Sequence, residues 1–96
     1  MEDLVYYNNL YDLYKNLLTD KQQEYFEDYY FNNLSLSEIA DNYNISRNAV
    51  SKQLSVIKKK LDDYEQKLEL YNKNQKINCL NIDENTKNKI MDILLP

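Results

Sequence analysis

The 96-residue sequence has no histidine, glycine or tryptophan, and it has only one proline and one cysteine. Without glycine there is no Walker loop and no dinucleotide-binding fingerprint, and without histidine there is no histidine-based catalytic triad and no zinc-finger pattern. Acidic pairs such as Asp62-Asp63 occur, but adjacent residues on a helix point in different directions. We therefore expect a protein that is not an enzyme and that holds no cofactor or metal ion.

Long apolar runs are also missing. No stretch could span a bilayer, and no charged segment followed by an apolar one opens the chain, so we expect neither membrane insertion nor a secreted precursor. The lone Cys79 cannot form an internal disulfide, which suits the reducing cytoplasm. A chain of 96 residues, 43% of them hydrophobic, fits one small cytoplasmic domain with a modest core.

Apolar residues recur at spacings of three and four along most of the chain, while strict alternation with β-branched residues is absent. This pattern predicts an all-α fold of about five helices. The first covers residues 3–18. Thr19 with Gln22, and Ser35 with Glu38, form two capping boxes, which predict the starts of a second and a third helix.

Ser46 can cap a fourth, long helix over residues 47–72, which completes a domain of residues 1–72. The polar residues 73–82 are typical of a loop. Residues 83–95 predict a last helix, which packs either on this domain or on a dimer partner.

The third and fourth helices match a helix-turn-helix, with the turn at residues 44–46. Ala40 is the small residue needed where the two helices cross. Asn44 stands where such turns commonly have glycine, and asparagine also tolerates a left-handed backbone. Large or branched apolar residues lie at the positions that lock the two helices together: Ile39, Tyr43, Ile45, Val50 and Leu54.

The fourth helix has one apolar and one polar face when its residues are placed about 100° apart. The polar face combines short side chains suited to base edges with cations suited to phosphate. We predict that eight residues bind DNA: Ser46, Arg47, Asn48, Ser51, Lys52, Ser55, Lys58 and Lys59.

Charge is distributed unevenly. Residues 1–41 sum to −7, residues 42–61 to +5 with no acidic residue, and residues 62–96 to −2, which gives the net charge of −4. Arg47, the only arginine, lies in the basic part. A helix face that only meets solvent could carry the same run of positive charge. The position of this run on a helix-turn-helix, however, favours an anionic partner.

So few cations predict weak, salt-sensitive binding by a monomer, and we favour a homodimer. A heptad pattern on the long helix offers one route, from Leu61 through Tyr64 and Leu68 to Tyr71. This seam could pack on the first helix within one chain or across a dimer. The ten tyrosines could stack on bases, but their helix-face spacing favours core and rim positions.

The segment "LLTDKQ…YY…LSLSEIA" followed by "ISRNAV" resembles the YlxM family of small bacterial proteins, which are similar to the promoter-binding region 4 of sigma factors. The resemblance covers Leu10–Leu70 and implies an all-helical fold. It also implies that Ser46, Arg47, Asn48, Ser51 and Lys52 occupy the recognition positions. The family is linked to the signal recognition particle pathway because its genes neighbour that of the particle's GTPase.

Two functions remain open at this stage. The first is a DNA-binding regulator that uses the polar face of the fourth helix. The second is an adaptor or modulator of the signal recognition particle, which would contact its GTPase or its RNA. As such an adaptor, the chain could bind RNA through the same basic face, or a basic protein surface through its acidic N-terminal half.

Overall fold

The computed structural model describes residues 4–94, and within that range it contains helices and no strand. The elements in chain order are α1 (Leu4–Tyr14), the 3-10 turn η1 (Lys15–Leu17), α2 (Asp20–Tyr30), α3 (Leu36–Tyr43), α4 (Arg47–Leu68), α5 (Leu70–Asn78) and α6 (Glu84–Leu94). The all-α prediction is confirmed, although the described residues form six α-helices rather than about five.

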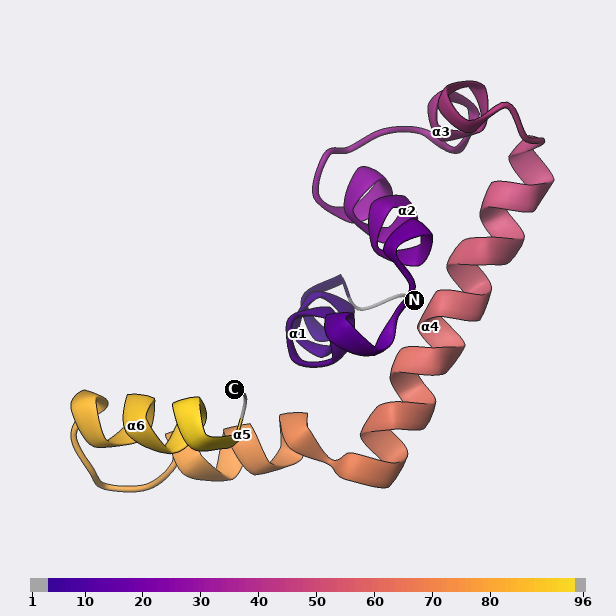
Figure 1. Cartoon of the computed structure of the whole chain (residues 1–96). Helices are drawn as coiled ribbons and strands as arrows, with labels where there is room; N and C mark the ends of the chain where they lie inside the picture. Colours follow the sequence, from indigo (N-terminus) through magenta and orange to yellow (C-terminus); the bar gives the residue numbers. More distant parts are fainter. Residues whose placement is uncertain (1–3, 95–96) are drawn as a thin grey trace.

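The long helix α4 is the central element against which the other helices are arranged (Figure 1). α3, α2 and α1 contact it one after another from its N-terminal end, and α5 and α6 extend from its C-terminal end. The core therefore lies between α4 and the first three helices. Its fully buried side chains include Leu10, Tyr11, Tyr14, Phe26, Ile39, Val50, Ile57 and Leu61.

Both predicted capping boxes form. The Thr19 hydroxyl accepts from the amide of Gln22, and the Gln22 side chain accepts from the amide of Thr19. Ser35 and Glu38 make the same reciprocal pair at the start of α3. Each pair satisfies two amides that a helix start would otherwise leave without a partner.

The helix-turn-helix is present with its turn at Asn44. Asn44 has φ 55° and ψ 44°, a left-handed conformation, and its amide donates to the carbonyls of Ala40 and Asp41. Ser46 then caps α4, because its hydroxyl accepts from the amide of Ala49 at 3.0 Å. The small side chain of Ala40 is buried at the crossing, so the sequence located the turn and both of its flanking helices.

The helix that follows the turn, α4, is shorter than predicted. It ends at Leu68 rather than at residue 72, because Glu69 adopts a left-handed conformation with φ 54°. A new helix, α5, begins at the next residue and runs to Asn78, so residues 73–78 of the predicted loop 73–82 are helical. Residues 79–82 remain outside any helix.

The last helix, α6, covers Glu84–Leu94, close to the predicted 83–95. It packs chiefly on α5 and forms a helical hairpin with it. Packing of this helix on the domain of residues 1–72 or on a dimer partner stays a prediction. Lys87 Nζ ties the hairpin by donating to the Asn78 carbonyl at 3.1 Å. The predicted helix ends at Asp3 and Leu95 lie outside the described residues, and among residues 4–94 no helix is long and apolar enough to cross a membrane.

The tyrosines are core and rim residues, as their spacing predicted. Tyr11, Tyr14 and Tyr25 are buried, and the other seven are partly buried against the same core. Tyr11 stacks on Phe26 with ring centroids 4.3 Å apart. This arrangement provides apolar area from the ring and leaves the hydroxyl to a polar partner.

The later half of the heptad seam packs on α1 within the chain. Tyr64 contacts Tyr14, with ring centroids 5.8 Å apart, and Tyr71 meets Tyr6 edge to face at 5.3 Å. Leu68 stays exposed. Of the two arrangements that the sequence left open for the seam, the structure has the intramolecular one.

Candidate nucleic-acid interface

The N-terminal half of α4 presents the polar face that the sequence predicts. Its opposite side is fixed in the core, because Val50, Leu54, Ile57 and Leu61 are buried. Seven of the eight predicted residues are exposed on the outer side or at the cap: Ser46, Arg47, Asn48, Ser51, Lys52, Ser55 and Lys59. A rigid helix therefore displays them together, and we call this set the α4 face.

Lys58 differs from the rest of the predicted set because it is half-buried. Its ammonium lies 5.8 Å from the centroid of the Tyr7 ring and 5.9 Å from that of Tyr30. These are cation–π distances, and they hold the charge at the edge of the α4 face, between α1 and α2.

The neighbouring lysines have other contacts. Lys59 Nζ lies 3.6 Å from Asp63 one turn on, and both side chains are largely exposed; such a pair contributes little to stability and can open toward a ligand. Lys60 Nζ donates to Oε1 of the buried Gln22 at 3.3 Å. Lys60 thus contributes to the packing of the fold, whereas Lys59 belongs to the α4 face and Lys58 lies at its edge.

A small hollow of about 100 Å³ adjoins the α4 face and was not predicted. It opens where the end of α2 and the start of α3 meet α4. The residues that line it are Tyr29, Tyr30, Leu36, Ser51, Leu54, Ser55 and Lys58. Three of these belong to the predicted binding set, while Tyr29 and Tyr30 are among the tyrosines that the sequence predicts at core and rim positions.

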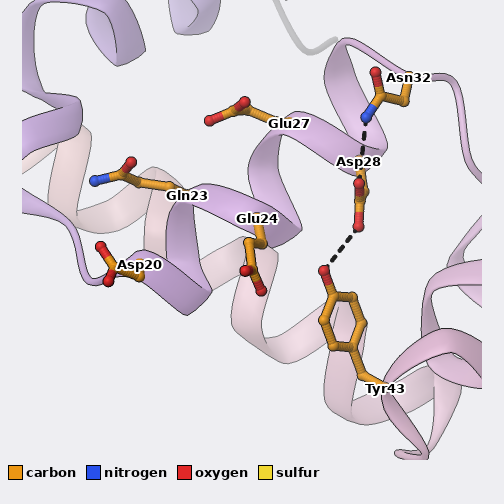
Figure 2. A pocket seen from close by; sticks show the side chains of 7 residues that line it. All are labelled: Asp20, Gln23, Glu24, Glu27, Asp28, Asn32 and Tyr43. Atoms are coloured by element: carbon orange, nitrogen blue, oxygen red, sulfur yellow. Dashed lines mark hydrogen bonds between the residues drawn. The ribbon is translucent and has the colours of Figure 1, made fainter.

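A second hollow, of about 500 Å³, lies along α2 and is strongly acidic (Figure 2). It is lined by Asp20, Gln23, Glu24, Glu27, Asp28, Asn32 and Tyr43. The Tyr43 hydroxyl and the Asn32 amide both donate to Asp28, at 3.0 Å and 3.3 Å. Figure 2 shows Tyr43 reaching α2 from the end of α3. This surface would attract cations and repel phosphate.

Two tyrosine hydroxyls, of Tyr11 and Tyr43, hold carboxylates of α2 in place. Burial, followed by the hydrogen bond to Glu27, raises the pKa of Tyr11 above its ordinary value of 10.0. Burial and the bond to Asp28 raise the pKa of Tyr43 in the same way. The hydroxyls therefore stay protonated and act as donors that fix the acidic side chains of α2.

The fold and the α4 face together define a helix-turn-helix protein with a basic helix after the turn and an otherwise acidic body. The chain belongs to the UPF0122 family, whose description reads "Putative helix-turn-helix protein, YlxM / p13 like" and whose profile matches residues 1–93. The resemblance found in the sequence is thereby confirmed.

Curated relatives support this membership. UPF0122 proteins of Staphylococcus aureus strains JH9, Mu50 and N315 are each 50% identical to the chain over 64 residues, which is 67% of this chain. The match spans 58% of the length of each of these relatives.

Proposed function

We propose that the chain is a DNA-binding regulatory protein that lays the first half of α4 in the major groove. The observation that carries this proposal is the exposed α4 face, which is polar and has no acidic residue. The opposite side of the same helix is packed into the core of the helix-turn-helix. The major groove is about 12 Å wide and admits one helix. Helix-turn-helix proteins place their second helix there, with its N-terminal residues at the bases.

The residues of the α4 face divide by chemistry. Arg47 and Asn48 lie in the first turn of α4, where side chains meet base edges, and arginine and asparagine pair bidentately with guanine and adenine. Lys52 and Lys59 of this face, and Lys58 at its edge, are suited to phosphates on either side. The protein acts by binding rather than by catalysis, and it works in the cytoplasm, where Cys79 remains a thiol.

The charge of the chain limits how tightly one copy can bind. Residues 42–61 supply five cations on a body that is otherwise acidic. Each neutralised phosphate makes the slope of log K against log salt more negative by about 0.9. With so few cations, a single copy should bind weakly at physiological salt. We propose a homodimer that doubles the footprint, which sedimentation in the presence and absence of duplex would test.

The test is fluorescence anisotropy of labelled genomic duplexes at low and physiological salt. Wild type should bind with a Kd of about 1 μM or below at low salt and weaken as salt rises. Lys52→Glu places an acid on the α4 face and should abolish binding. Lys67→Glu makes the same charge change at the exposed far end of α4 and should keep it. No binding by wild type, or equal effects of the two variants, would overturn the proposal.

One observation favours a second candidate function. The acidic hollow on α2 is suited to a basic protein surface, as an adaptor of the signal recognition particle GTPase would need. Under this alternative, wild type binds the purified GTPase or particle RNA but not duplex DNA. Glu24→Lys would then weaken GTPase binding, whereas Lys52→Glu would not.

A further inference from the structure

The hollow beside the α4 face has the chemistry of an anion site. Its lining includes one lysine, two tyrosines and two serines, and no acidic residue. Lysine, tyrosine and serine side chains are among the groups that contact DNA phosphates. The hollow on α2, by contrast, is lined by four carboxylates, so a phosphate would be attracted to the first hollow and repelled from the second.

The position of the hollow also fits a passing DNA strand. Ser51 and Ser55 belong to the α4 face, while Leu36 is the first residue of α3. The hollow therefore lies between the recognition helix and the start of the helix that precedes it. In helix-turn-helix complexes that preceding helix crosses the sugar–phosphate backbone, so the strand that flanks α4 in the groove would run past this point.

Lys58 is the charged group of the hollow, and two aromatic rings position it. Its ammonium lies near Tyr7 of α1 and Tyr30 of α2. An ammonium held in place gives up less side-chain freedom when it meets an anion. Ser55 contributes less, because its hydroxyl donates to the Ser51 carbonyl at 3.2 Å.

We propose that this hollow, with Lys58 and Tyr29 as its principal donors, binds one phosphate of the DNA strand that flanks α4. The inference rests on the proposed DNA-binding function and extends it to Tyr29, which sequence analysis placed only in the rim of the core. The occupant is a backbone phosphate, so the site contributes affinity and register rather than sequence preference.

The test compares three variants by anisotropy over a salt series. Lys58→Met keeps the apolar stem and removes the charge; it should weaken binding roughly tenfold and lower the salt slope by about one. Tyr29→Phe removes only a hydroxyl; it should weaken binding several-fold and leave the slope unchanged. Lys67→Met, an exposed lysine at the far end of α4, is the matched control and should change neither.

The outcomes separate the two proposals. If wild type binds DNA and Lys52→Glu does not, but Lys58→Met behaves like Lys67→Met, the phosphate site is wrong and the DNA-binding function stands. Wild-type affinity of Tyr29→Phe would likewise remove the hollow from the interface. If Lys58→Met fails to fold by circular dichroism, Tyr29→Phe alone decides the question, because Tyr29 lies outside the α4 face. No binding by wild type would overturn both proposals.

Discussion

The hydroxyl of Tyr14 donates to Oε1 of Glu65 across 2.7 Å, joining the buried side of α1 to the last turns of α4. The same hydroxyl accepts from the amide of Leu70, and the Glu65 carboxylate accepts from the amides of Tyr71 and Asn72. One tyrosine and one glutamate therefore cap the start of α5. Burial and the bond to Glu65 raise the pKa of Tyr14, so the donor stays protonated.

This junction predicts the effect of Glu65→Ala. The substitution removes the acceptor of two amides and one hydroxyl, so the free energy of unfolding should fall by about 1–3 kcal/mol. Urea denaturation measures the change. Gln66→Ala, at an exposed neighbouring position, should stay within about 0.5 kcal/mol of wild type. A double-mutant cycle of Tyr14→Phe and Glu65→Gln should be non-additive by at least about 0.5 kcal/mol; additive effects would contradict the junction.

Asn44→Ala tests the turn of the helix-turn-helix. Because φ is 55° at this position, a residue with a Cβ and no polar side chain should lower the free energy of unfolding by about 1 kcal/mol. Asn44→Gly should be as stable as wild type or slightly more so. Thermal unfolding followed by circular dichroism compares the two variants. Asn42→Ala, at an exposed position of α3, is the control. A larger loss for glycine than for alanine would contradict the left-handed turn.

Glu69→Gly tests the left-handed position that ends α4. Glutamate at φ 54° carries a steric penalty that glycine lacks, although glycine also gains entropy in the unfolded chain. We expect a net increase in the free energy of unfolding of about 0.5 kcal/mol. Glu69→Ala keeps the Cβ and should bring no increase. Urea denaturation measures both, and a loss with glycine would show that α4 continues unbroken past Leu68.

Alkaline pH should destabilise the protein through its tyrosines. The pKa values of Tyr11, Tyr14 and Tyr43 lie above 10.0, the value expected in the unfolded chain. Their contribution is therefore complete below about pH 10 and is lost as pH rises toward the folded pKa values. Urea unfolding at a series of pH values should show this fall. Tyr43→Phe should make it shallower, and an unchanged slope would contradict the raised pKa.

Arg47 should set sequence preference. In the first turn of α4, a bidentate contact to guanine would contribute about 1–3 kcal/mol of discrimination at one base pair. Arg47→Lys keeps the charge but loses the planar fork, so it should bind preferred and mismatched duplexes almost equally at a nearly unchanged salt slope. Competition among duplexes selected by wild type measures this. Retained preference in Arg47→Lys would assign base reading to other residues.

Local signals determined much of this protein from the sequence. The capping boxes at Thr19 and Ser35, the cap at Ser46 and the asparagine of the turn act within four residues, so their outcome follows from neighbouring side chains. The buried stripe of α4 follows from its helical period alone. For the same reason, all the predicted recognition residues except the half-buried Lys58 lie exposed where the pattern put them.

Tertiary contacts decided the rest. The break at Glu69 depends on Glu65 and on Tyr14, which is more than 50 residues away along the chain. A contact between such distant residues leaves no local pattern, so the polar stretch after the break was predicted as a loop. The two hollows, the ring contacts of Lys58 and the choice of α1 as partner of the seam arise where distant segments meet. Periodicity shows which side of a helix is buried, but only the assembled helices show what lies against it.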